Sequence, residues 1–341
     1  MSTKRVVLAE YFTTEDLTLL FIVREDFEEP EVIEIPKSLK EIQQFVMDRF
    51  REEWNEEGEL VKSTSDQIRD LDQKAYQAFF EPFVAPLVSH SAKSDKGDLM
   101  TNEGDIIWLV PHDVLHYLPL HALKVDGQYL MERNPICYTP SASVMKYCHA
   151  KRKGRRETAL VLGDSLNDLL SAREEALMVA QMFDTTPVLG QQATKSMLTE
   201  ALEQRGDEID ILHLACHGYF DPYQPLKSGI KLAQGKNGEH SSHQQPWNLT
   251  AEEIFGLSMK ADLVALTACE SGVNERKPGD ELMGLTRSLI YAGTPSVLVT
   301  LWRVSDLSTQ ILMKEFYTRL KAGLMKVEAL RQAQTTYELN N

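Results

Sequence analysis

From Thr158 onward the sequence alternates short, continuously apolar runs with longer amphipathic stretches, and this alternation limits the fold more than any other feature. Runs such as ALVLG, IDILHLA, DLVALTA and PSVLVTLW lack the alternating polar pattern of a half-exposed strand. The segments between them, such as SAREEALMVAQMF, ATKSMLTEALEQR and ELMGLTRSLIYAG, have helical periodicity. Buried strands separated by helices predict an α/β domain with a mostly parallel sheet flanked by helices.

The region before this domain has a different pattern. RVVLAEYF, LTLLFIVRE and EVIEIP are short apolar bursts separated by polar turns, and they predict a small antiparallel sheet. Two helices are expected after it, over 38–54 and over 70–81, and the second is expected to end before Pro82. The chain is therefore predicted to begin with a smaller region of β-hairpins and helices.

A basic run separates the two regions. KRKGRRE, residues 151–157, is expected to be a solvated linker. We therefore expect an N-terminal β/α region over 1–157 and the larger domain over 158–341. The first region can be a degenerate second copy of the larger domain or an unrelated cap, because both would show similar apolar runs.

Charge and cysteine content exclude several classes of protein. The net charge of −15, from 51 acidic and 36 basic residues, argues against a nucleic-acid partner. Four cysteines without a C-x-x-C pair do not suggest a disulfide framework in a chain of 341 residues, so a cytoplasmic location is expected. No apolar run is long enough to predict a signal peptide or a membrane span.

Two of the predicted strands end on a reactive side chain. HLACHGYF contains His217, and LVALTACESG contains Cys269. Functional groups gather at the carboxyl ends of parallel strands, so these side chains would face each other if their strands are neighbours. The imidazole can then take the thiol proton, and the N–H groups of Gly218 and Cys269 can bind an oxyanion. This set of groups is sufficient for acyl transfer.

Several motifs in order resemble the CHAT family of caspase-like cysteine peptidases, which is related to caspases and separases. They are HLACHG, LTACESG, GDELMGLTRSLIYAGTPSVLVTLWRVSD, PHDVLHYLPLHAL and NPICYTPSASV, and the resemblance covers the chain from about Ala75 onward. Cys269 follows His217 by 52 residues, close to the interval of about 50 in the caspase signature. The resemblance implies a Cys269 nucleophile, a His217 base, no cofactor and no required carboxylate as a third member.

The resemblance also implies a specificity pocket. In separase-like relatives, an aspartate that follows a similar L-W-x-V-x-D segment pairs with the arginine before the cleaved bond. In LWRVSD this residue is Asp306, with Trp302 nearby, which implies cleavage after Arg or Lys. Asp280 and Glu281 are alternatives for the pocket carboxylate. Asp306 can equally cap the helix that is expected to begin near Leu307.

One segment has the outline of a zinc motif. His112, Asp113 and His116 form H-D-V-L-H, close to the H-E-x-x-H pattern. The aspartate is too short for the usual role of the glutamate, and Pro111 and Pro119 leave no room for the long helix that this motif needs. We therefore expect no metal site.

The other cysteines have a structural interpretation. Successive side chains of a strand point to opposite faces, so Cys216 is expected to point away from its neighbour His217. Cys216, Cys137 and Cys148 are predicted to be core residues, as free cysteines commonly are.

The chain departs from the family pattern in two ways. No repeat of 34 residues is found, whereas many CHAT proteins carry tetratricopeptide repeats, so recruitment would come from the N-terminal region or from a separate protein. The family usually continues past the A-L-R-Q-A helix into an aromatic-rich strand, whereas this chain ends at TTYELNN. This predicts a truncated or divergent carboxyl terminus that exposes a sheet edge.

Together these features predict a cysteine endopeptidase that acts on a protein or peptide substrate. Its activity is expected to stay weak until an activating or recruiting protein orders the substrate-binding loops. Two alternatives stay open: a catalytically silent scaffold in a signalling complex, and a nonpeptidase acyltransferase that uses the same thiol.

Overall fold

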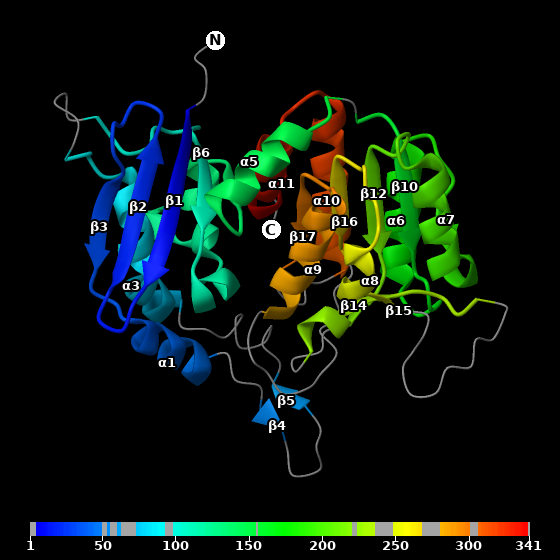
Figure 1. Cartoon of the computed structure of the whole chain (residues 1–341), viewed down its shortest axis with the longest axis horizontal. Coiled ribbons are helices and arrows are strands. Elements are labelled where there is room, and N and C mark those ends of the chain that lie inside the picture. Colours follow the sequence, from blue (N-terminus) through cyan, green and yellow to red (C-terminus); the bar gives the residue numbers. More distant parts are fainter. Residues whose placement is uncertain are drawn as a thin grey trace. The chain divides into compact units, whose positions relative to one another are not determined.

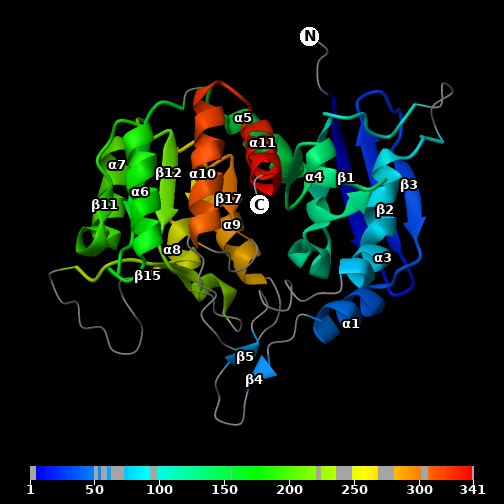
Figure 2. The same ribbon diagram turned by 180° about the vertical axis from the view of Figure 1, so that it is seen from behind.

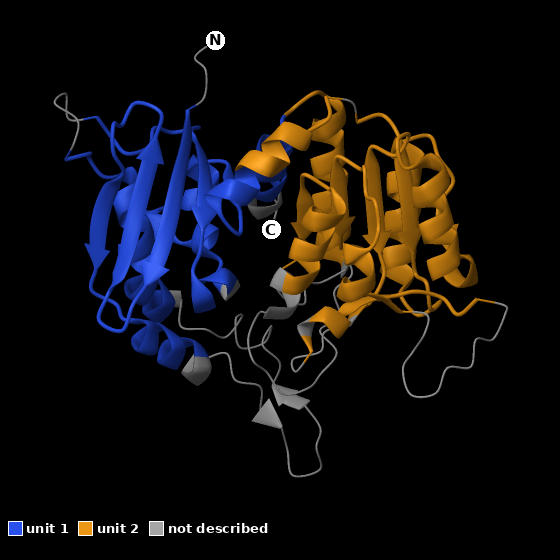
Figure 3. Cartoon of the chain, in the orientation of Figure 1, with its two compact units in different colours: residues 1–145, 325–341 blue, residues 146–324 orange. Residues whose placement is uncertain are grey.

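The computed structural model of the chain describes residues 5–49, 53–54, 60–62, 73–92, 98–154, 156–219, 224–235, 248–267, 280–300 and 306–339. The chain divides into two compact units (Figure 3). The first contains Met1–Met145 and Met325–Asn341, and the second contains Lys146–Leu324. The second unit is therefore an insertion in the first. The last helix, α11 (Lys326–Leu339), lies in the unit that holds the N-terminal strands.

A five-stranded mixed sheet forms the centre of the first unit, in the order β3-β2-β1-β6-β9 (Figure 1). Its strands are β1 (Val6–Thr13), β2 (Thr18–Arg24), β3 (Glu31–Ile35), β6 (Ile106–Val110) and β9 (Ile136–Tyr138). The first three pair antiparallel, which confirms the predicted antiparallel sheet. β6 and β9 extend it in parallel, a pairing that connects distant segments and that the local pattern does not predict.

Helices α1 and α3 cover one face of this sheet. Ile42 of α1 and Phe80 and Phe83 of α3 are fully buried in one core with the strands. The helices of the unit are α1 (Leu39–Arg49), α3 (Gln73–Val84), α4 (Leu130–Arg133) and α11, with 3-10 helices η1 (Ala85–Val88), η2 (Asp113–Tyr117) and η3 (Leu120–Ala122). The described part of the unit also contains two hairpins, β4 (Glu53–Trp54) with β5 (Leu60–Lys62) and β7 (Lys124–Val125) with β8 (Gln128–Tyr129).

The predicted end of the second helix before Pro82 is wrong, because α3 continues through it to Val84. Proline removes one backbone hydrogen bond from a helix. Phe83 and Val84 are both fully buried, and burying two such side chains stabilises the fold by roughly 3–6 kcal/mol, enough to offset that loss.

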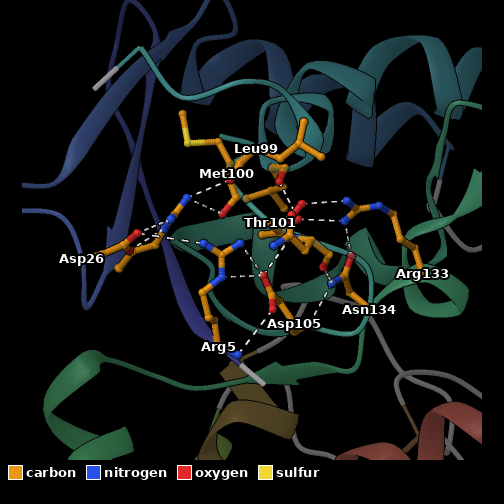
Figure 4. Close-up of polar contacts among 11 residues, drawn as sticks. Arg5, Asp26, Leu99, Met100, Thr101, Asp105, Arg133 and Asn134 are labelled. Atoms are coloured by element: carbon orange, nitrogen blue, oxygen red, sulfur yellow. Dashed lines mark hydrogen bonds and ion pairs between the residues drawn. The ribbon is translucent and has the colours of Figure 1, made fainter. Parts of the chain in front are cut away.

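Arginine side chains hold the segment that leads into β6 (Figure 4). Arg24 is buried and donates from Nη1 to the carbonyl oxygens of Leu99 at 2.8 Å and Met100 at 3.3 Å. Arg133 donates from Nη2 to the carbonyl oxygen of Thr101 at 2.7 Å. These carbonyl oxygens accept hydrogen bonds from arginine side chains in place of a neighbouring strand. The contacts therefore hold this irregular segment in place.

Five parallel strands form the sheet of the second unit, in the order β11-β10-β12-β16-β17 (Figure 1). They are β10 (Ala159–Gly163), β11 (Val188–Leu189), β12 (Ile211–Ala215), β16 (Leu263–Leu266) and β17 (Val297–Val299). Every residue of β12 and β16 is buried, which explains their continuous apolar runs. The structure confirms the predicted α/β fold with its parallel sheet.

Helices lie on both faces of this sheet. Figure 2 shows α6 and α10 on one face, where they pack against each other and α6 packs on β10 and β12. On the other face, Leu198 of α7, Ile254 of α8 and Leu289 of α9 share a core with Leu212 and Val264 of the strands. The described helices of this unit are α6 (Leu170–Met182), α7 (Lys195–Arg205), α8 (Ala251–Phe255), α9 (Asp280–Ala292) and α10 (Asp306–Lys321), with η4 (Gly190–Gln192) and η5 (Pro225–Lys227). The boundary between the two units falls within α5 (Ala142–Lys151).

A small antiparallel sheet follows β12 and was not predicted. Its strands are β13 (Gly218–Tyr219), β14 (Gly229–Lys231) and β15 (Asn248–Thr250). Strands of two or three residues are too short to show a period in the sequence. In the part of the chain that the structure describes, no helix is both long and apolar enough to cross a membrane.

Candidate active site

The two strands that end on reactive side chains are neighbours in the sheet. β12 pairs in parallel with β16, with Leu214 opposite Leu266. The N–H of Thr267 donates to the carbonyl oxygen of Leu214 at 3.2 Å, so the pairing continues one residue past β16. Cys269 follows Thr267 by two residues and lies outside the described residues. The parallel, adjacent arrangement that the dyad requires is therefore present up to that point.

His217 lies just past the carboxyl end of β12 and is only 4% exposed. Its Nε2 atom is 2.9 Å from Oδ1 of Asp168. Its carbonyl oxygen accepts a hydrogen bond from the N–H of Lys231 in β14 at 2.8 Å. The histidine is thus held from its side chain and its backbone at once.

The backbone direction of Gly218 follows from the same hydrogen bond. The carbonyl of His217 points toward β14, and successive residues of an antiparallel strand direct their backbone groups to opposite sides. Gly218 stands opposite Ile230 as the next pair in this ladder, so its N–H points away from β14. An N–H that the ladder does not use is what an oxyanion hole requires.

Asp168 was not predicted, because no carboxylate was expected beside the histidine. This residue lies in the loop between β10 and α6, and β10 is the parallel neighbour of β12. The rule that placed His217 at a strand end also applies to the loop GDSLND, which follows the end of β10 and contains two aspartates. That rule, applied to all the strands, could have found Asp168.

A second histidine of β12 takes part in a buried polar cluster. His213, fully buried, has Nε2 at 3.0 Å from Oε1 of Glu175 and Nδ1 at 3.0 Å from the hydroxyl of Tyr317. Burial, and then the Glu175 carboxylate, raise the pKa of Tyr317 well above its ordinary value. The cluster joins α6, β12 and α10.

The described cysteines differ in burial. Cys216 and Cys148 are buried, as predicted, whereas Cys137 is half-buried. Burial is also the main cause that raises the pKa of the Cys216 thiol to about 11. A thiol with this pKa is almost entirely protonated near neutral pH and is therefore a poor nucleophile.

The H-D-V-L-H segment folds as His112 followed by the 3-10 helix η2, so it lacks the α-helical spacing of the zinc motif. Nδ1 of His112 lies 2.6 Å from the hydroxyl oxygen of Thr13 in β1. Among the residues that the structure describes, no three histidine, cysteine or acidic side chains are arranged to hold a metal ion.

The expected pocket residues lie at or beyond the edges of the described segments. Trp302 lies outside them. Asp280 and Glu281 are the first residues of α9, and Asp306 is the first residue of α10. The structure describes the backbone of these three acids but not their side chains, so their role as pocket carboxylates stays a prediction.

Comparison with known proteins gives a family match over most of the chain. The model of the CHAT domain matches residues 69–340. Tetratricopeptide repeat protein 28 of Mus musculus is 25% identical over 315 residues, and the match covers 77% of this chain and 12% of that protein. The Homo sapiens protein of the same name is 25% identical over 309 residues, covering 75% and 12%. The chain thus spans about an eighth of the length of these relatives, and it belongs to the caspase-like CHAT domain family.

Proposed function

We propose that the chain is a cysteine endopeptidase that hydrolyses a protein substrate through Cys269 and His217. One observation carries the proposal: a buried histidine stands at the carboxyl end of a strand whose parallel neighbour leads, three residues after Leu266, to a cysteine. Family membership supports the same pair of residues.

The chemistry follows from the roles of these groups. Cys269 transfers its thiol proton to His217, and the thiolate attacks the scissile carbonyl carbon. The N–H of Gly218, together with that of Cys269, stabilises the oxyanion. The C–N bond then breaks as His217 returns the proton to the leaving amine, and water hydrolyses the thioester with His217 as base. No cofactor is needed for these steps.

The proposed preference for Arg or Lys before the cleaved bond depends on Asp306. α10 begins at this residue and is the next described element after β17, and β17 is the parallel neighbour of β16. A carboxylate at this edge of the sheet would pair with a cationic side chain of the substrate. Asp280 and Glu281 begin α9, which follows the Cys269 segment, and they are the alternatives.

We further propose that a helical-repeat protein recruits or activates the chain in the cytoplasm. Two curated relatives are named for tetratricopeptide repeats, and repeats of this kind form extended binding surfaces. The same observation favours a second candidate function, a catalytically silent module that acts as a scaffold within such an assembly.

Time-resolved cleavage of a diverse peptide library separates the two candidates. We expect the wild-type chain, with cell extract added in parallel to supply an activator, to cleave after Arg or Lys. Cys269→Ala should abolish cleavage, and Cys148→Ala should serve as a matched control that retains it. Asp306→Ala should lower kcat/KM for basic substrates by about a hundredfold, since a charge-assisted pair contributes roughly 2–3 kcal/mol.

If the extract-supplemented wild type and Cys269→Ala give the same products, the peptidase proposal fails and the scaffold becomes the better conclusion. If Asp280→Asn or Glu281→Gln, rather than Asp306→Ala, removes the basic preference, the pocket carboxylate lies on α9.

A further inference from the structure

We propose that Asp168 is a positioning residue that fixes the ring proton of His217 on Nε2, an inference that rests on the proposed cysteine chemistry. The 2.9 Å between Nε2 and Oδ1 of Asp168 is a hydrogen-bond distance. An ionised carboxylate can only accept a hydrogen bond. The nitrogen that faces it must therefore carry the hydrogen, and Nδ1 of the neutral ring carries the lone pair.

The loop that carries Asp168 is held by its own side chains. Asp164, only 1% exposed, accepts from the N–H of Leu169 at 2.8 Å and from Nε of Arg173 at 2.7 Å. Arg173 also donates to Oδ1 of Asn167 at 2.7 Å. Asp164 and Asn167 have φ of 48° and 59°, in the left-handed region that aspartate and asparagine tolerate best. The backbone is therefore fixed on both sides of Asp168.

The same loop is joined to the elements that hold the histidine. The N–H of Asp164 donates to the carbonyl oxygen of Ala215, the last residue of β12, at 2.9 Å. The hydroxyl of Ser165 donates to the carbonyl oxygen of Lys231 at 2.7 Å, and the N–H of Lys231 donates to the carbonyl oxygen of His217. Asp168 and His217 are thus parts of one hydrogen-bond network. Its backbone contacts keep the two residues close even without the bond between their side chains.

A fixed proton position has a direct consequence for the reaction. With Nε2–H donated to Asp168, Nδ1 is the atom that receives the thiol proton of Cys269 and later gives it to the leaving amine. The opposite tautomer would present an N–H to the thiol and could not act as a base. Because the side chain of Asp168 is 54% exposed, water screens its charge, so its role is orientation more than electrostatic stabilisation.

Nuclear magnetic resonance of the ¹⁵N-labelled full chain carrying Cys269→Ala tests the proposal without any substrate. The His217 ring signals are identified by their loss in His217→Asn. At a pH where the ring is neutral, we expect one tautomer, protonated at Nε2, with an Nε2–H that exchanges slowly enough to be observed. Asp168→Ala should abolish that slowly exchanging signal, while Glu174→Gln, which removes an exposed charge on α6, should retain it.

A ring protonated at Nδ1, or an unchanged Nε2–H signal in Asp168→Ala, would overturn the proposal. With a cleavable substrate in hand, Asp168→Ala should lower kcat by about tenfold or more and leave KM within about twofold, because the ring loses its orientation and not its substrate. If the tautomer is as expected but no peptide is cleaved, the endopeptidase function fails while the positioning role of Asp168 stands.

Discussion

At the scale of single residues, the environment of each thiol decides its reactivity. Cys216 directly precedes His217, yet burial raises its pKa to about 11. At pH 8 such a thiol is about one part in a thousand ionised. Reactivity in this region is therefore expected from Cys269 alone.

Alkylation of the native protein checks this expectation. Iodoacetamide at pH 8 should modify Cys269 within minutes and leave Cys216 unmodified, because the buried thiol is both protonated and inaccessible. Peptide mass spectrometry of the digested protein measures each site. His217→Ala should slow the modification of Cys269 only, and denaturant should make all four cysteines react. Equal rates at Cys216 and Cys269 in the native state would contradict the prediction.

Functional residues can be predicted from the sequence where the adjacent residues of the chain identify them. His217 was found because an apolar run ends on it, and the position of its strand beside β16 is confirmed. Asp168 also follows the end of a strand, but its contact with His217 joins positions 49 residues apart and depends on the pairing of β10 with β12, which the sequence does not show. The Cys269 segment and the pocket acids stay predictions.

At the scale of elements, a glycine of η4 supports the Asp168 loop. Gly190 has φ of 56°, and a Cβ added to it would lie 2.3 Å from Oδ1 of Asn167, the atom that accepts from Arg173. A side chain at this position would both strain the backbone and displace the asparagine. The conformation of the loop after β10 therefore depends on Gly190, which follows the next strand, β11.

Gly190→Ala is expected to be more destabilising than Gly323→Ala. Gly323 also has a positive φ, 91°, but nothing lies within 4 Å of an added Cβ, and it belongs to the same unit. Both changes should cost about 1 kcal/mol of backbone strain. Gly190→Ala should lower the free energy of unfolding by roughly 1–3 kcal/mol more, because it also disrupts hydrogen bonds. This corresponds to several degrees in the unfolding temperature. Equal unfolding temperatures, measured by calorimetry, would show that Asn167 has room to move.

Most elements of the second unit could be predicted because the hydrophobic pattern of each segment alone indicates a strand or a helix. β10, β12, β16, α6, α7 and α9 all lie where their apolar patterns indicate. The end of α3 could not be predicted, since the burial of Phe83 outweighs the local effect of Pro82. Short strands such as β13 are set by pairing with a distant segment and leave no local pattern.

At the scale of the whole molecule, the chain is organised as one unit inserted into another. α11 packs with α4 and β9 of the first unit, and Arg331 donates to the carbonyl oxygen of Glu132 at 2.6 Å. We expected this helix in the larger domain, 158–341, because the two are contiguous in sequence.

Deletion of residues 326–341 is therefore expected to destabilise the first unit and leave the second intact. Removal of α11 exposes the surfaces of α4 and β9 to water and leaves the carbonyl of Glu132 without its arginine. Hydrogen exchange read by mass spectrometry should show faster exchange in β1 and β6 and unchanged exchange in β10 and β12. Deletion of residues 340–341 alone is the control. Faster exchange confined to β10 and β12 would contradict the assignment of α11.

The insertion also determines how the molecule would respond to mechanical tension. A pull between the two ends enters through β1 and leaves through α11, and both lie in the first unit. No force acts on the inserted unit, which holds the candidate active site, until α11 separates from α4 and β9. In a chain stretched between two anchored partners, the inserted sheet would therefore stay free of tension until the first unit unfolds.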